Sequence, residues 1–148
     1  MTHIKDEYLE KLESVLNKHA NIVDSDSYNL WLAKTFLTCD SQIVWSQIPN
    51  TIRDRANYCQ PNYDYDKKAT EFVSKIAKLT QYQEQLIIIP DGATEYSVKM
   101  TFDDLIAVVG EIVDFPQHTY IIPEDKSFVI VLTMDGLMDY APTPAQYP

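Results

Sequence analysis

The chain has 148 residues and a mass of 17.1 kDa, which is enough for one globular domain and too little for two independent cores. Hydrophobic residues make up 45% of it, and this excludes an intrinsically disordered chain. No apolar run reaches the roughly 20 residues that a membrane-spanning helix needs, and the first residues lack an apolar signal segment. We therefore expect a cytoplasmic protein that has no membrane partner. Its two cysteines are too few for a disulfide scaffold.

Charge is the most informative bulk property of the chain. Twelve basic residues stand against 22 acidic residues, so the net charge is −10, and residues 90–148 hold ten acidic residues but two basic ones. This balance disfavours direct binding to nucleic acid, which requires a basic surface. An acidic region can speed the docking of a basic protein partner, or it can serve solubility alone.

The first half of the chain reads as helical. Apolar residues recur at helical spacing from residue 3 to 19, and a second helix follows the capping residues 24–27. The second helix is apolar almost all round, so we expect it to be well buried. Prolines interrupt residues 40–65, for which we expect helical turns joined by loops. Asp66 is the expected cap of a third helix, about 67–81.

The second half changes to β-strand patterns around one further helix. The expected strands are 86–89, 118–122, 128–133 and 137–140, and the expected helix is 102–114. Residues 94–100 alternate weakly and could form a further strand. Short connections predict an antiparallel meander for the last three strands, and the doubly apolar run at 128–132 should be central and covered on both faces. We expect residues 141–148, which are rich in proline, to leave the sheet. The prediction is a single α+β domain over residues 1–141, with N-terminal helices followed by an antiparallel sheet of about four strands with one inserted helix, and a flexible tail at 142–148.

A search for chemistry finds no catalytic or metal-binding pattern. The three histidines include one near the predicted sheet, His118, which we expect to be a hydrogen-bonded structural imidazole. No His-Glu-x-x-His or Cys-x-x-Cys pattern occurs, and the three glycines do not cluster into a phosphate-binding loop. We therefore predict no cofactor, no metal and no enzymatic activity.

Tyrosines are concentrated in the segment 57–66, where Tyr63 and Tyr65 alternate with Asp64 and Asp66. Such a loop could bind an Arg- or Lys-rich surface through ion pairs and cation–π contacts. Alternatively, the rings could hold a long loop against the domain.

The segment 118–136 consists of a strand, the turn Pro123-Glu124-Asp125, and a second strand that ends Leu132-Thr133-Met134-Asp135. It resembles the C-terminal hairpins of small acidic bacterial immunity proteins that accompany polymorphic or contact-dependent toxins. The resemblance covers about 25 residues and carries no catalytic residues. It implies stoichiometric inhibition of a cognate basic toxin, possibly a nuclease.

These observations predict a protein-binding inhibitor with a basic protein partner. The candidate partner-binding residues are the acidic groups of helix 102–114 and of two turns, together with two tyrosines: Asp103, Glu111, Asp114, Glu124, Asp125, Asp135, Asp139, Tyr63 and Tyr65. Three alternatives stay open: a nucleic-acid mimic that blocks a nuclease or regulator, a small enzyme with an unrecognised carboxylate site, and a homo-oligomeric structural protein.

Overall fold

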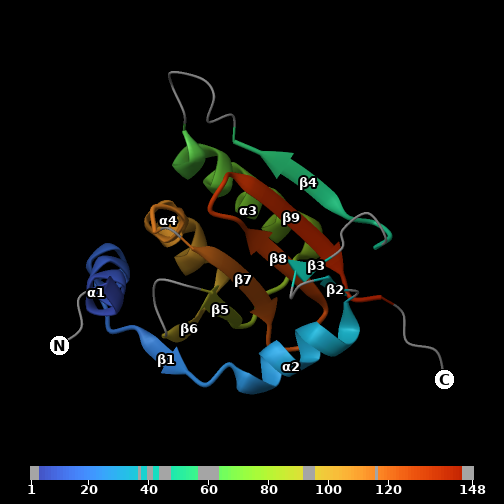
Figure 1. Cartoon of the computed structure of the whole chain (residues 1–148). Helices are drawn as coiled ribbons and strands as arrows, with labels where there is room; N and C mark the ends of the chain where they lie inside the picture. Colours follow the sequence, from blue (N-terminus) through green and yellow to red (C-terminus); the bar gives the residue numbers. More distant parts are fainter. Residues whose placement is uncertain are drawn as a thin grey trace.

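The computed structural model describes residues 4–36, 38–39, 42–43, 48–56, 64–91, 96–115 and 117–144. Within these residues the fold is α+β, with four helices arranged around an antiparallel sheet of seven strands and a separate two-stranded hairpin (Figure 1). The helices are α1 (Ile4–Leu16), α2 (Asp26–Thr35), α3 (Tyr65–Thr80) and α4 (Phe102–Val113). None of the helices in the described part combines the length and apolarity that crossing a bilayer requires.

The large sheet has the strand order β1-β6-β5-β7-β8-β9-β4, and every neighbouring pair is antiparallel. Its strands are β1 (Asn21–Val23), β4 (Ile52–Arg55), β5 (Leu86–Asp91), β6 (Ser97–Met100), β7 (His118–Pro123), β8 (Phe128–Leu132) and β9 (Leu137–Pro142). The hairpin pairs β2 (Thr38–Cys39) with β3 (Gln42–Ile43).

Both faces of the sheet are covered. On one face α4 packs against both α1 and α3, and the three helices share one hydrophobic core with the sheet (Figure 1). On the opposite face, α2 lays Tyr28, Trp31 and Leu32 against a second, smaller core that includes Ile87 and Val129. Because β8 is buried at every position, the expectation of a central strand covered on both sides is confirmed.

The ends of α3 and α4 follow from local capping. The Asp64 side chain accepts a hydrogen bond from Lys67 N, so the cap of α3 is Asp64 and the prediction of Asp66 is wrong. The helix ends where Gln81 adopts a left-handed conformation (φ 53°). Thr101 caps α4 by accepting from Asp104 N. The predicted helix and strands of the second half are confirmed to within a few residues.

The sheet is larger than the predicted four strands because short strands are recruited at its two edges. β4 lies inside the segment for which helical turns were expected, and it pairs with β9 in the register Arg53↔Asp139. Its sequence Ile-Arg-Asp-Arg has no apolar alternation, so its conformation comes from tertiary pairing rather than from local pattern. At the other edge, the three-residue strand β1 pairs with β6, and its conformation likewise comes from that pairing.

Two further expectations are corrected. No residue of α2 is fully buried, and Leu30 is 62% exposed, because the helix forms an outer layer that contacts the sheet along one side only. The sheet does not end before Ala141, because Ala141 pairs with Val129 and Pro142 with Phe128. Pro142 is the last residue of its strand, where a missing N–H is tolerated. The predicted tail residues 145–148 lie outside the described part.

The packing of the main hydrophobic core can be tested at Phe128. It is 2% exposed, stacks on Phe102 at 6.1 Å, and contacts the rings of Tyr82 and Tyr140. We expect Phe128→Ala to lower the free energy of unfolding by about 3–5 kcal/mol, measured by urea denaturation. Leu79→Ala is the control, since Leu79 is 56% exposed, and should change stability by less than about 1 kcal/mol. Similar losses in both variants would contradict the core assignment.

Candidate functional site

An open cavity of about 510 Å³ lies where the start of α3 meets the end of α4 and the turn between β8 and β9. Three carboxylates and an exposed methionine contribute to its walls. We call it the acidic pocket, and its lining is Asp64, Tyr65, Asp66, Val113, Asp114, Phe115 and Met134. Within the described residues it therefore combines three negative charges with an apolar wall and with no basic side chain.

Asp66 and Asp114 form a hydrogen-bonded pair of carboxyl groups across this pocket. The pKa of Asp66 is raised to about 6, first by desolvation and then by the hydrogen bond with Asp114 and the charges of Asp114 and Asp64. Asp66 lies against Gly110 of α4, where an added Cβ would be in ordinary van der Waals contact, 3.5 Å from the Cβ of Asp66. Asp66 thus keeps its proton to a higher pH than an ordinary aspartate does, up to about 6.

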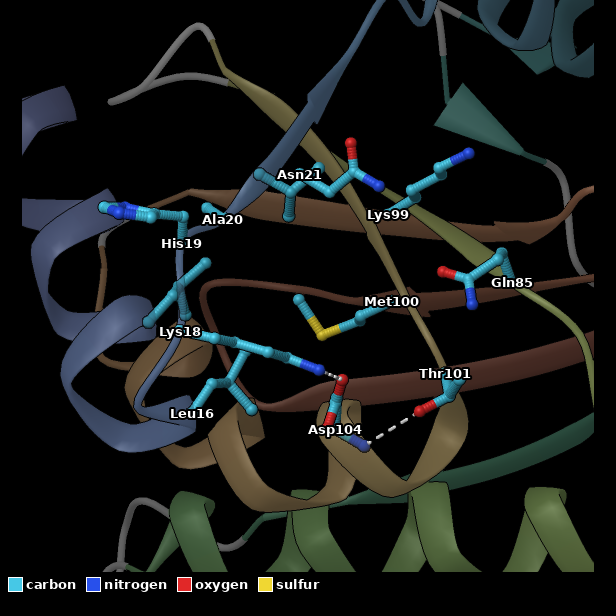
Figure 2. A pocket seen from close by; sticks show the side chains of 12 residues that line it. Leu16, Lys18, His19, Ala20, Asn21, Gln85, Lys99, Met100, Thr101 and Asp104 are labelled. Carbon is cyan, nitrogen blue, oxygen red and sulfur yellow. Dashed lines mark hydrogen bonds and ion pairs between the residues drawn. The ribbon is translucent and has the colours of Figure 1, made fainter.

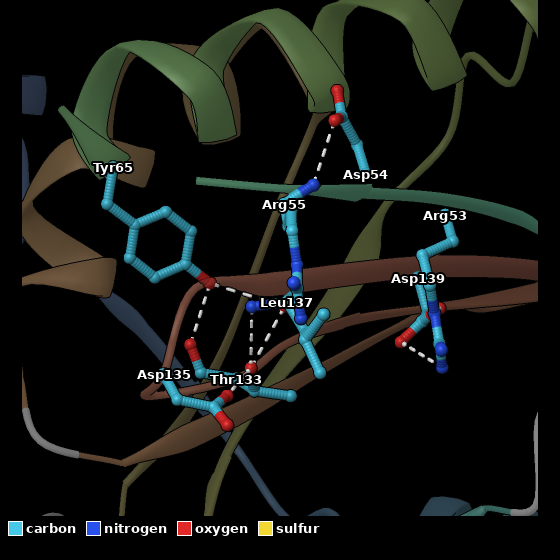
Figure 3. A network of polar contacts seen from close by, with 8 residues as sticks. All are labelled: Arg53, Asp54, Arg55, Tyr65, Thr133, Asp135, Leu137 and Asp139. Atoms are coloured by element: carbon cyan, nitrogen blue, oxygen red, sulfur yellow. Dashed lines mark hydrogen bonds and ion pairs between the residues drawn. The ribbon is translucent and has the colours of Figure 1, made fainter. Parts of the chain in front are cut away.

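The turn between β8 and β9 is held in place by side chains from two other elements. The Tyr65 hydroxyl donates to Thr133 O at 2.7 Å (Figure 3), and Met134 N donates to His118 Nδ1 at 3.1 Å. The Thr133 hydroxyl bonds to the Asp135 carboxylate and also accepts from Leu137 N at 2.9 Å. The turn is consequently rigid, and it presents Met134, 56% exposed, at the mouth of the pocket.

These contacts also define the environment of His118, whose Nδ1 accepts a hydrogen bond from the backbone N–H of Met134. The expected hydrogen bond of the imidazole is confirmed, and its structural role stays a prediction. In the part of the chain that the structure describes, no group of three His, Cys, Asp or Glu residues could hold a metal ion.

The predicted partner-binding acids are divided between the two ends of the sheet. Asp114 lines the acidic pocket, and Asp135 follows Met134 in the turn beside it. This is the end at which β7 begins, because Met134 is bonded to His118. Glu124 lies at the other end of β7, where its N–H donates to Gln85 O at 3.0 Å, and Asp125 adjoins it in an exposed turn.

The remaining predicted acids lie along α4. Asp103, on the first turn, is exposed, and Glu111, near the last turn, is partly exposed. Asp103 is therefore far along the helix from Asp114. The structure does not gather all the predicted acids into a single surface.

Two predicted residues are inside the protein, which corrects their assignment to a binding surface. Tyr65 is 4% exposed because its ring is part of the main core, so its role is to anchor the turn. Asp139 is 1% exposed and is bonded to Arg53 Nε at 2.6 Å and Nη2 at 3.4 Å (Figure 3). The prediction for Tyr63 falls outside the described residues.

The candidate list omits Asp64 and Asp66, although both line the pocket. Their alternation with tyrosines was the available signal, and it was compatible both with a basic ligand and with a loop held against the domain. Nothing in the sequence indicates that Asp66 meets Asp114, 48 positions later, because that contact depends on how α3 packs against α4. Comparison with known proteins finds no family model that matches this chain and no curated protein with significant sequence similarity.

The Asp66 carboxyl predicts a pH dependence of stability. Its folded-state pKa lies above the ordinary value of 3.8, so the folded protein holds this proton more tightly than the unfolded chain. The stability that the proton contributes is full below 3.8 and is lost as the pH rises through about 6.

We expect urea denaturation over this pH range to show wild-type stability falling relative to Asp66→Asn, which carries no titrating group. Asp103→Asn, outside the pocket, should keep the wild-type profile. A wild-type profile in Asp66→Asn would show that the pair does not hold the proton.

The ion pair between Arg53 and Asp139 predicts a second effect on stability. Burial raises the pKa of Asp139, whereas the hydrogen bond and charge of Arg53 oppose that rise. Arg53→Met should therefore leave a buried, unpaired carboxylate and lower the unfolding free energy by about 2–3 kcal/mol at neutral pH. The loss should shrink on acidification, when Asp139 is protonated, and in the double variant with Asp139→Asn. An equal loss in single and double variants would assign the effect to packing of the arginine stem.

Proposed function

We propose that the protein is a stoichiometric inhibitor, of the kind that immunity proteins represent, and that it binds a basic protein partner through the acidic pocket. The observation that carries the proposal is the meeting of Asp64, Asp66 and Asp114 around a cavity that Met134 borders. A lysine or arginine side chain from the partner fits this chemistry, since its charged end meets the carboxylates and its aliphatic stem contacts Met134.

The charge of the pocket supports a cationic occupant. Ionised Asp66 is less stable beside the charges of Asp114 and Asp64 than an isolated aspartate is, so Asp66 holds its proton up to about pH 6. A guanidinium or ammonium group in the pocket replaces that proton and pairs with both acids. Binding is therefore coupled to proton release, and it strengthens as the pH rises through about 6.

The end of α4 adds a second reason. A helix C-terminus carries a partial negative charge that basic residues commonly complement. No basic residue occurs in the last turn of α4, and its C-cap is the acidic Asp114. A cation from the partner would complement the helix end and the carboxylates together.

The rigid turn supports recognition of a protein rather than of a free ion. Met134 and Asp135 project from a turn that Tyr65 and His118 fix in position, so little conformational entropy is lost when a partner contacts them. An apolar side chain bordered by charges is a common arrangement for a binding hot spot and its rim.

The experiment compares two double variants with the same change in charge. Asp66→Lys/Asp114→Lys alters the pocket, and Glu124→Lys/Asp125→Lys alters the exposed turn at the other end of β7. Tagged wild-type protein and both variants are used to capture partners from lysate of the source organism. The captured basic protein is then purified, and its association rate and the stoichiometry of its inhibition are measured.

We expect the control variant to bind almost as the wild type does, whereas the pocket variant should lose at least about tenfold in association rate at low salt. The inhibition should be complete at one equivalent of protein. Equal losses in both variants would mean that net charge alone drives binding, and undiminished binding by the pocket variant would reject this site.

The Asp66–Asp114 pair also favours a second candidate, a small enzyme that uses one carboxyl as an acid and the other as a base. A pKa of about 6 is suited to proton transfer near neutral pH. This candidate requires turnover of a small substrate, such as a chromogenic ester or glycoside, by the protein alone. That turnover should be abolished in Asp66→Asn and kept in Asp103→Asn.

A further inference from the structure

A second cavity, of about 310 Å³, lies at the opposite end of the helix layer from the acidic pocket. It is the more enclosed of the two and is bounded by the end of α1, the segment that leads into β1, strand β6 and the first turn of α4. We call it the α1–β6 cavity. Because Met100 and Leu86 pair with each other near Pro123, this end of the sheet is remote from His118 and the acidic pocket.

The inner surface of this cavity is apolar. Leu12 and Leu16 come from α1, and Val98 and Met100 come from alternate positions of β6, which face the main core. Leu12 and Val98 are buried at 1% and 0% exposure, so the apolar surface open to an aliphatic or aromatic group is that of Leu16, which is partly exposed, and the edge of Met100, which is 5% exposed.

The mouth of the cavity carries one positive and one negative group. Lys18 Nζ and Asp104 Oδ2 are 2.6 Å apart, and Figure 2 shows the two meeting beside the Met100 thioether. Their side chains are 58% and 25% exposed, so both can be reached from solvent. Such an accessible pair contributes little to stability and can exchange partners readily.

The other basic side chains of the lining are directed elsewhere. His19 is fully exposed and lies 3.6 Å from Glu13, and Lys99 lies 3.9 Å from Glu124. The charge that faces the cavity is therefore balanced, with Lys18 opposite Asp104.

We propose that the α1–β6 cavity binds a small zwitterion with an apolar side chain, chemically an apolar α-amino acid. Its carboxylate pairs with Lys18, its ammonium group pairs with Asp104, and its side chain lies against Leu16 and Met100.

The balance of charge selects this class of ligand. A simple carboxylate that takes Lys18 leaves Asp104 unpaired, and a simple amine that takes Asp104 leaves Lys18 unpaired. A zwitterion replaces both partners at once, so neither protein charge is left without a counter-ion. The volume is at the lower end of that of small-molecule sites, which suits a ligand the size of leucine, methionine or phenylalanine.

The test is a titration of the complete chain with L-leucine, followed through the methyl resonances of Met100 and Leu16 by NMR. Two half-ligands serve as comparisons: 4-methylpentanoate carries only the carboxylate, and 3-methylbutylamine carries only the amine. We expect L-leucine to shift both resonances with a dissociation constant in the millimolar range, as its size implies. Each half-ligand should bind at least about tenfold more weakly.

Two variants test which protein group pairs with each charge of the ligand. Lys18→Gln and Asp104→Asn should each weaken L-leucine binding about tenfold, because each removes one ion pair with the ligand. The matched controls are Lys75→Gln on α3 and Asp103→Asn on α4, both of exposed residues that do not line the cavity, and both should bind as the wild type does.

The proposal is overturned if L-leucine shifts neither methyl at about 10 mM, which exceeds the expected dissociation constant. It is also overturned if a half-ligand binds as tightly as L-leucine, or if Lys18→Gln and Asp104→Asn leave binding unchanged. None of these outcomes depends on the acidic pocket, so the two proposals stand or fall separately.

Discussion

The burial of β7 and β8 on both faces is the constraint on which the architecture depends. Residues 128–132 are apolar at every position, so the sheet is stable only where material covers each side. Three helices cover one face and α2 contributes to the cover of the other. To share one face, α3 and α4 must pack side by side, and this packing brings the first turn of α3 next to the last turn of α4. The proximity of Asp66 and Asp114 is a consequence of covering the sheet.

That consequence is unfavourable for the isolated protein. The raised pKa of Asp66 means that the stability of the folded state falls as the pH rises through about 6, and no lysine or arginine of the described chain lines the pocket to offset the negative charge. The contrast with Asp139 is informative, because there the chain supplies its own arginine from β4 and buries the acid completely. The Asp66–Asp114 pair is open to solvent beside a rigid, partly apolar turn. A positively charged group of another molecule could therefore reach it and reduce the repulsion between the two acids.

Sequence reasoning succeeded where a segment carries its own pattern. α3, α4 and the final three strands have clear periodicity and turn residues, and their burial follows from that pattern. It failed where conformation comes from a neighbour, as in β1 and β4, whose short sequences are ordered by pairing with β6 and β9. The acidic pocket is of the second kind. Each of its acidic residues can be read from the sequence. The pairing of Asp66 with Asp114, however, follows from helix packing that no local pattern encodes.

The distribution of charge illustrates the same limit. Residues 90–148 carry most of the net negative charge, which suggested one acidic field over the second half of the chain. In the fold Asp114 and Asp135 lie toward one end of β7, and Glu124 and Asp125 lie toward the other. Asp64 and Asp66 of the first half join Asp114 around the acidic pocket. A partner attracted by one broad acidic surface would therefore find the acidic residues divided between separate areas. Under the proposed function, a single basic side chain of the partner needs only the local charge of the acidic pocket, so the proposal assigns selectivity to this site rather than to the total charge of −10.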